Sequence, residues 1–371
     1  MQFDLFHSIG RVDNLQPKLS DKQVFENFFA QTNLADELGF NTIWVAESHF
    51  SSEVQKRHPN PVIPNYLGEV GLNNDSCQLA QKIFQSTKNI GFGTAIYNIV
   101  GGNGGPIGAA DRIRSLAFLN EFQSTPRQLD IGIAQGRFPY INQPYGIFPR
   151  NELEKKDWAN VNRMIFLEAL EIFLRLSLGE TISDQSITKY PGIEPRWIFD
   201  ELKLVPEIKP NKINFILGST DPLARQLAFK LCDIDLFNLS FTPPEQINAL
   251  HDELATVCQP PRKPWKRNRL PRTVLVFIDK DAKTAQKIAH QAFDTYIDAM
   301  QGTVKLPPKE ALMARALIGN AEQVIEQLSP DDPHDFRQED RLMLWFEFNQ
   351  SDNAKICERM QYFYEQVKPH V

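Results

Sequence analysis

Apolar segments of strand type alternate with amphipathic segments of helical type along the whole chain. Eight short apolar runs are predicted as strands, at 3–8, 42–46, 89–96, 129–134, 213–218, 233–240, 272–278 and 341–348. Between and after them, apolar residues recur at helical spacing in 21–38, 76–87, 111–122, 162–178, 221–231, 243–257, 281–300 and 352–367. Strands that are apolar on both faces indicate parallel pairing under a cover of helices.

Eight parallel strands are the number that closes a (β/α)8 barrel. An open doubly wound sheet shows the same alternation, but it normally has a glycine-rich phosphate loop directly after the first strand. Here the first strand runs into HSIGRVDN, and GGNGG at 101–105 lacks the G-x-G-x-x-G spacing and is interpreted as a flexible loop. We therefore expect an α/β fold, a (β/α)8 TIM barrel with loop insertions, as a single domain over residues 1–371.

Charge and composition argue against several other classes of protein. The net charge of −6 is spread without long blocks of one sign, which gives no footprint for nucleic acid or an anionic membrane. The one basic cluster, RKPWKRNR at 262–269, is interpreted as a solvated loop. The four cysteines lie far apart, which indicates neither a zinc site nor a disulfide framework and suits a reducing cytoplasm. No metal site is expected, and the apolar runs are too short to span a membrane.

Polar and small residues follow the predicted strands, where a barrel of this kind has its active site. TIWVAESHF at 42–50 ends in Glu47, Ser48 and His49. LGSTDPLARQLA at 217–228 passes from strand to helix through Ser219 and Thr220, whose hydroxyls could hold a phosphate together with the N–H groups at the helix start. The alternative interpretation is a plain helix N-cap that uses one of these same hydroxyls. Aromatic residues in the loops suit either a pocket for a flat ligand or a small satellite core; they are Phe50, Tyr97, Phe138 and Tyr140.

Several stretches, in this order and spacing, resemble the bacterial luciferase-like flavin-dependent monooxygenase family. They are LADELGFNTIWVAESHF, STKNIGFGTAI, SLAFLNEFQSTPRQLDIGIAQG, ILGSTDPLARQLA, ALIGNAEQVIEQL and RLMLWFEFNQSDNAKICERMQYFYEQVKP. The resemblance implies a (β/α)8 barrel that uses reduced FMN, supplied by a separate flavin reductase, and O2 to oxygenate a small organic substrate. Such chemistry needs a dry site, because water releases hydrogen peroxide instead of product. Candidate lids are the insertions at 51–72, 137–157, 179–211 and 301–320.

The resemblance also implies roles for single residues. Glu47, Ser48 and His49 take the positions of the catalytic segment after the second strand. A non-proline cis peptide is implied between Ala95 and Ile96, beside the flavin ring. The residues implied for cofactor binding are Thr94, Ala95, Ile96, Gln135, Gly136, Arg137, Arg163, Ser219 and Thr220.

The chain departs from the family pattern at three of these positions. Ser48 stands where luciferase has a catalytic His, Gln135 where an Arg often meets the phosphate, and Ala134 at the reactive cysteine position. Light emission from a long-chain aldehyde is therefore not expected, whereas oxygenation is. Two alternatives stay open: a hydride-transfer enzyme that uses F420, whose acidic tail would favour a more basic rim, and a flavin-binding protein without turnover. The substrate cannot be predicted from the sequence, and a homodimer is an open expectation.

Overall fold

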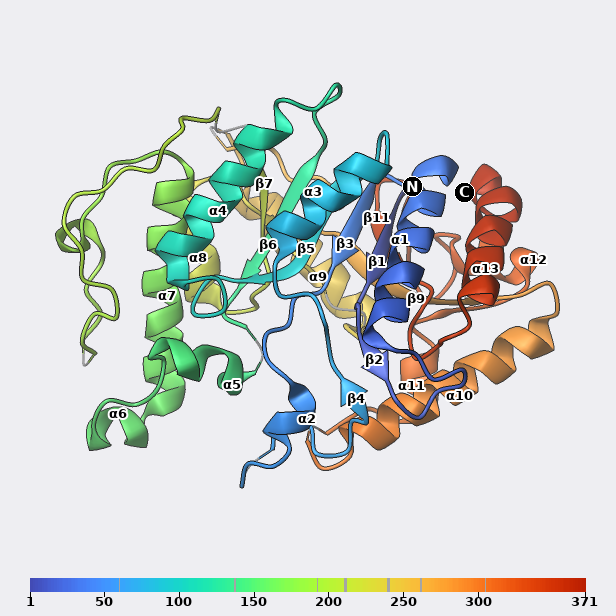
Figure 1. Ribbon diagram of the computed structural model, residues 1–371. Helices are drawn as coiled ribbons and strands as arrows, with labels where there is room; N and C mark the ends of the chain where they lie inside the picture. Colours follow the sequence, from blue (N-terminus) through green and yellow to red (C-terminus); the bar gives the residue numbers. More distant parts are fainter. Residues whose placement is uncertain are drawn as a thin grey trace.

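Parallel strands form a barrel in the computed structural model, which describes residues 1–59, 61–136, 138–191, 193–209, 212–238, 241–260, 262–303 and 305–371. The barrel strands are β1 (Gln2–His7), β3 (Thr42–Val45), β5 (Gly91–Asn98), β6 (Leu129–Ala134), β7 (Asn214–Leu217), β8 (Asp235–Leu236), β9 (Arg272–Ile278) and β11 (Arg341–Trp345) (Figure 1). They pair in the order β9-β11-β1-β3-β5-β6-β7-β8, and β10 (Leu317–Gly319) is added beside β9. A parallel bridge between Asn238 and Arg272 joins the two ends and closes the circle. The expected (β/α)8 barrel is confirmed, with every predicted strand in it.

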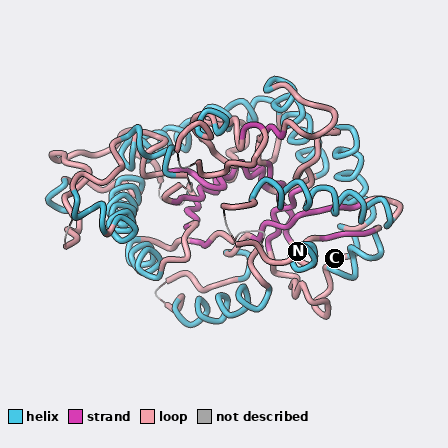
Figure 2. Tube along the Cα trace, turned by 90° about the horizontal axis from the view of Figure 1, so that it is seen from below, coloured by secondary structure: helices cyan, strands magenta, loops and turns pink. Residues whose placement is uncertain are grey.

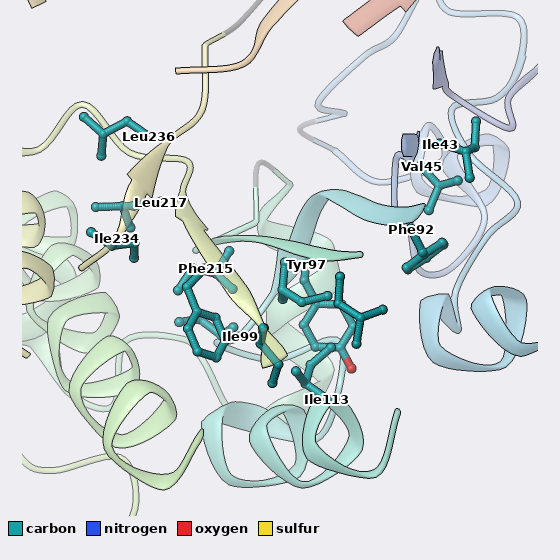
Figure 3. Close-up of a cluster of buried hydrophobic side chains, with 14 of the residues drawn as sticks. Ile43, Val45, Phe92, Tyr97, Ile99, Ile113, Phe215, Leu217, Ile234 and Leu236 are labelled. Carbon is teal, nitrogen blue, oxygen red and sulfur yellow. The ribbon is translucent and has the colours of Figure 1, made fainter. Parts of the chain in front are cut away.

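Helices surround the barrel, as Figure 2 shows. They are α1 (Asp21–Leu38), α3 (Ser76–Ser86), α4 (Gly105–Asn120), α7 (Trp158–Ser177), α8 (Pro222–Leu231), α9 (Pro244–Val257), α10 (Ala282–Met300) and α13 (Asn353–Gln366). Buried side chains of the strands pack against them, and Figure 3 shows Tyr97 and Ile99 beside Ile113 of α4. Because full burial of one such side chain contributes about 1.5–3 kcal/mol, this layer binds the helices to the barrel.

Helix α4 begins earlier than the sequence predicts, at Gly105 instead of residue 111. Gly104 (φ 83°) is its N-cap, and Pro106 lies in the first turn, where its missing N–H costs nothing. A Cβ added at Gly105 would lie 2.7 Å from Trp197 Nε1. The interpretation of 101–105 as a loop is confirmed for 101–104, which form turns, whereas Gly105 already belongs to the helix.

Shorter elements lie in the loops, and the sequence did not predict them. Strand β2 (Arg11–Val12) pairs antiparallel with β4 (Gly68–Glu69). The short helices are α2 (Ser52–Gln55), α5 (Pro139–Asn142), η1 (Gln143–Tyr145), α6 (Glu152–Lys156), η2 (Asp184–Ser186), η4 (Arg267–Arg269), α11 (Lys309–Met313), α12 (Ala321–Gln327) and η5 (Lys368–His370). The predicted insertion at 179–211, here called the outer segment, is mainly loop with a bridge between Ile182 and Leu202, and it runs along the outside of the helices at the left of Figure 1.

Charged side chains fill the amino-terminal end of the barrel. Arg341 donates to Asp4 at 2.6 Å and to Asp130 at 2.7 Å, and its guanidinium lies 5.2 Å from the centre of the Trp44 ring. The Trp44 indole N–H donates to Asp4 at 2.7 Å. Burial raises the pKa of Asp130, but the Arg341 guanidinium outweighs it and holds this pKa below its ordinary value. The barrel is therefore plugged at this end by an ionic cluster.

The basic segment 262–269 contributes to this plug. Arg269 is 2% exposed and donates to Asp235 of β8 at 2.6 Å. Arg267 donates to Asp340, just before β11, at 2.6 Å. The interpretation of this segment as a solvated loop is wrong for these two arginines, because they bond to carboxylates on β8 and just before β11, which are remote in the sequence.

Candidate active site

A cavity of about 380 Å³ lies at the carboxyl ends of the barrel strands, where barrel enzymes have their active sites. The strand ends contribute Phe6, Ser8, Ala46, Glu47, His49, Ala95, Ile96, Asn98, Gly136, Phe237, Trp345 and Glu347. The loops add mainly apolar side chains, including Val12, Leu15, Ile63, Tyr66, Val70, Phe138, Ile141, Tyr296, Met300 and Phe348. A mainly apolar pocket with a few polar groups is the usual form of a small-molecule site.

Glu47 and His49 form a hydrogen-bonded pair on the cavity wall. His49 Nε2 lies 2.8 Å from Glu47 Oε1, and the two side chains are 8% and 1% exposed. The same carboxylate oxygen accepts from Asn103 Nδ2 at 2.9 Å and from the Asn98 N–H at 3.3 Å, and the Ser76 hydroxyl donates to Oε2 at 3.4 Å. A carboxylate held by this many donors is fixed, and it fixes the orientation of the His49 ring.

Gly102 packs against the His49 ring. A Cβ added at Gly102 would lie 2.6 Å from both Nε2 and Cδ2 of His49, closer than real Cβ atoms approach. Only glycine therefore leaves room for the ring in this position. The sequence offered one signal for this residue, the glycine-rich stretch after the third strand, but it did not reveal the contact.

Ser48 does not join the pair. Its side chain is buried and would meet a Cβ at Gly71 at 2.8 Å, and its N–H donates to the Asn73 carbonyl at 2.8 Å. The Tyr140 hydroxyl lies near it; burial raises the pKa of Tyr140 to about 12, although Ser48 partly opposes the shift. Ser48 lies outside the cavity lining formed by the described residues. The structure brings Glu47 and His49 to the cavity and turns Ser48 away from it.

Strand β5 carries a non-proline cis peptide between Ala95 and Ile96, as the resemblance predicts. Both residues line the cavity. The Ile96 side chain lies over Gly218, where an added Cβ would be 2.1 Å from Ile96 Cδ1. Thr94 faces elsewhere: it is fully buried, and its hydroxyl donates to the Gly132 carbonyl at 2.8 Å. Two of the three residues predicted beside the flavin ring therefore reach the cavity.

The predicted residues after β6 are only partly at the cavity. Gly136 lines it with φ 84°, and an added Cβ would lie 2.7 Å from Asn98 Nδ2. Gln135 instead donates to the Asn162 carbonyl at 2.8 Å. Arg137 lies outside the described residues.

Ser219, Thr220 and Arg163 gather at the start of α8, but a carboxylate is already there. Asp221 is the N-cap of α8, and its Oδ1 accepts from the Leu223 N–H at 3.0 Å. Arg163 donates to both Asp221 oxygens, at 2.6 and 2.5 Å, and this hydrogen bonding lowers the pKa of Asp221. The Ser219 hydroxyl accepts from the Asp221 N–H at 3.2 Å. The alternative of an N-cap made by the Ser219 or Thr220 hydroxyl is therefore wrong, because Asp221 is the capping residue of α8.

Aromatic residues of the loops divide between the cavity and the core. Phe138 lines the cavity, and Tyr140 stacks on it with ring centres 5.7 Å apart. Phe50 is 51% exposed, whereas Tyr97 is fully buried on the outside of β5, toward the helices.

A second polar group on the cavity wall had no role in the sequence prediction. Glu347 Oε1 accepts from the Ser8 N–H at 2.6 Å and from the Ser8 hydroxyl at 2.8 Å. His7 Nδ1 lies 3.4 Å from the same oxygen, and burial lowers the pKa of His7 although Glu347 opposes this shift. In the sequence, Ser8 and Glu347 lie at the ends of two predicted strands. These strands, β1 and β11, are far apart in the sequence and become neighbours only in the barrel.

Within the described residues, no group of His, Cys, Asp and Glu side chains is arranged to hold a metal ion. Among the described helices, none has the length and apolar character needed to cross a membrane.

Comparisons with known proteins agree with this geometry. Solved structures similar to the full length of this chain include the monooxygenase RslO1 from Streptomyces bottropensis (18% identity, 99% of that chain, TM-score 0.74). Others are the oxygenating constituent of 3,6-diketocamphane monooxygenase from Pseudomonas putida in complex with FMN (17%, 98%, 0.64) and an F420-dependent secondary alcohol dehydrogenase in complex with an F420-acetone adduct (14%, 99%, 0.57). These likenesses concern the fold, and no curated protein sequence matches significantly. The model of the luciferase-like monooxygenase family matches residues 1–330, so the chain belongs to that family.

Proposed function

We propose that this protein is a flavin-dependent monooxygenase that uses reduced FMN and O2 to oxygenate a small organic substrate. The observation that carries the proposal is that the Glu47–His49 pair and the Ala95–Ile96 cis peptide line one mainly apolar cavity in a chain of this family. A separate flavin reductase would supply the reduced FMN, and the chain would work as one domain in a reducing cytoplasm.

The cavity fits the flavin ring better than the start of α8 fits its phosphate. Ala95, Ile96 and Gly136 present backbone and small side chains to a mainly apolar space. At α8, Asp221 already engages the helix start and two nitrogens of Arg163. Arg163 Nη1 has no partner among the described residues, so a phosphate would be held by this nitrogen and the hydroxyls of Ser219 and Thr220.

The residues of the cavity support oxygenation in two ways. When bound, reduced FMN would supply the electrons that activate O2. Because Glu47 engages His49 Nε2 and no described residue bonds to Nδ1, Nδ1 is the ring atom that we expect to accept a proton. The apolar walls keep water away, which protects the oxygenation from loss as hydrogen peroxide.

Reoxidation of reduced FMN tests the proposal. Chemically reduced FMN is mixed with O2, with and without the protein, and the absorbance of oxidised flavin and the hydrogen peroxide formed are followed. We expect the protein to delay reoxidation and to lower the peroxide yield. His49→Ala should shorten the delay at least several-fold, whereas His290→Ala, at an exposed histidine of α10, should leave it unchanged.

The same assay separates the alternatives. Tight FMN binding with reoxidation as fast as that of free flavin would favour a flavin-binding protein without turnover. Selective binding of F420 over FMN would favour hydride transfer. The cavity does not favour the acidic tail of F420, because no Lys or Arg is found among its described lining residues.

A further inference from the structure

We propose that the substrate is a neutral, mainly apolar ring compound that carries a hydroxyl or N–H hydrogen-bond donor, and that Glu347 binds this donor. The inference rests on the proposed function and deepens it by naming a substrate class. Three observations carry it: the charges on the cavity wall, the hydrogen bonds of its two carboxylates, and the aromatic rings that line the same cavity.

The charges on the wall disfavour an anionic substrate. Glu47 and Glu347 are carboxylates, and no Lys or Arg lies among the described lining residues. An anion here would lose its hydration without gaining a cation from the described lining residues, and it would also face two like charges. A substrate with a carboxylate, sulfonate or phosphate group close to the ring is therefore a poor fit.

The two carboxylates differ in what they can still accept. Both Glu47 oxygens already have donors within the protein, from His49, Asn103, Asn98 and Ser76. Glu347 uses only Oε1, which accepts both bonds from Ser8. No described residue donates to Glu347 Oε2, and Glu347 lines the cavity. An ionised carboxylate oxygen without a donor is a strong acceptor, so it selects a ligand that brings a donor.

Aromatic rings line the same cavity as this acceptor. The Trp345 ring lies 4.6 Å from that of Phe6 and 4.8 Å from that of Phe348, and all three residues line the cavity. Aromatic walls favour a flat ring, which makes edge and offset contacts with them. An ammonium group would also satisfy Glu347, but its remaining N–H donors would meet apolar walls, so a neutral donor fits better.

Binding of matched naphthalene probes to the full-length protein tests the inference. The probes are 2-naphthol, 2-methoxynaphthalene, which lacks the donor, and 2-naphthoate, which is an anion. We expect naphthol to bind about tenfold more tightly than methoxynaphthalene, because a hydrogen bond to a charged group is lost in the ether. Naphthoate should bind most weakly. Calorimetric titration gives the three affinities.

Glu347→Gln should remove the preference for naphthol and strengthen binding of naphthoate. The amide oxygen would accept from Ser8 and turn its NH2 group toward the cavity, so the acceptor is lost. Glu339→Gln, at an exposed glutamate, is the matched control and should keep the wild-type order. If Glu347→Gln does not fold, as judged by circular dichroism, the wild-type affinities alone decide.

Equal binding of naphthol and methoxynaphthalene by the wild type would overturn the inference, and so would an unchanged preference in folded Glu347→Gln. Tighter binding of 2-naphthylmethylammonium than of naphthol would overturn the assignment of a neutral substrate. The titrations contain no flavin and depend on no turnover. If the wild type shows no donor preference but delays flavin reoxidation, only this inference is refuted. If it prefers naphthol but does not delay flavin reoxidation, only the proposed function is refuted.

Discussion

The imidazole of His49 is held from two sides by neighbours of opposite kind. Glu47 holds it with a hydrogen bond of 2.8 Å, and Gly102 holds it by having no side chain, since an added Cβ would lie 2.6 Å from the ring. A group that must accept a proton works only in a narrow range of positions. The glycine is therefore as much a part of the arrangement as the carboxylate.

Gly102→Ala should destabilise the protein by roughly 1–3 kcal/mol, because the new methyl group overpacks against the His49 ring. In the His49→Ala background the ring is gone, so the same change should be nearly neutral. Urea unfolding of the wild type, both single variants and the double variant measures this difference. An equal loss in both backgrounds would show that the strain arises elsewhere.

The sequence predicts which residues lie at the strand ends, but it does not predict the direction in which each side chain points. Glu47 and His49 were correctly expected at the mouth of the barrel, whereas Ser48 between them turns away, as neighbouring positions on an extended chain do. Glu347 and Gly102 were not assigned roles. Their contacts join residues remote in the sequence, and no local pattern reports such contacts.

At the scale of the elements, the start of α8 combines a helix cap with an ion pair. Arg163 lowers the pKa of Asp221 from its ordinary value of 3.8. A carboxylate with a lowered folded pKa contributes stability above its unfolded pKa, and this contribution is lost as the pH falls through the folded value. The Arg163 side chain is 41% exposed and that of Asp221 is 16% exposed, so solvent screening limits the contribution of the pair to about 1 kcal/mol or less.

Asp221→Asn should therefore flatten the loss of stability below about pH 4, since Asn still caps the helix but carries no charge. The variant also frees Arg163, so FMN should bind several-fold more tightly if its phosphate lies at this helix. Unfolding curves at several pH values and FMN titrations measure the two effects. An unchanged affinity would remove Arg163 from the phosphate site.

The outer segment is held to the helices by a buried ion pair. Arg196 donates to Glu154 at 2.7 Å, with side chains 1% and 3% exposed, and the N–H groups of Arg196 and Trp197 donate to Glu168. Removing one partner of a buried pair leaves the other charge uncompensated, which costs roughly 3–5 kcal/mol.

Arg196→Ala should accordingly loosen the outer segment before it unfolds the barrel. We expect faster chymotryptic cleavage after Trp197 and Phe199, with the barrel fragments remaining intact. Lys189→Ala, at a side chain that is 47% exposed in the same segment, is the control and should be cleaved like the wild type. Cleavage of both variants at the wild-type rate would mean that other contacts hold the segment.

Long elements were predicted well, and short ones were not. The eight barrel strands and eight main helices follow a strong apolar periodicity, which burial on a large core imposes. Elements such as β2, β4 and α2 are too short to show a period, and α4 starts at glycines that only tertiary packing makes helical. The cis peptide at Ala95–Ile96 was reached through family resemblance, and not through any local pattern.

At the scale of the whole molecule, the two ends of the barrel differ in structure. The amino end is filled by the ionic cluster around Arg341, and the carboxyl end holds the cavity. Trp44 is fully buried in the barrel interior and contacts the cluster. We therefore expect changes at the amino end to alter stability and leave the chemistry of the folded protein intact.

Arg341→Met should reduce the free energy of unfolding by roughly 3–5 kcal/mol, because Asp4 and Asp130 are left buried without their cation. Adding Asp4→Asn and Asp130→Asn should recover part of this loss. Denaturant unfolding measures stability, and the FMN reoxidation delay, scaled to the folded fraction, should match the wild type. A shorter delay in the folded protein would contradict the separation of the two ends.

The bridge that closes the barrel affects where the barrel opens locally. Among the described residues, the two ends of the barrel sheet pair through one backbone bridge, from Asn238 to Arg272, and the Thr273 hydroxyl donates to the Asn238 carbonyl at 3.2 Å. In contrast, β1 and β11 pair at four positions. Local opening occurs first where two strands share the fewest hydrogen bonds. Deuterium should therefore exchange into the Asn238 and Thr273 amides well before it exchanges into those of β1. Phe237 and Thr273, which lie beside this bridge, also line the cavity, so each opening would widen the cavity.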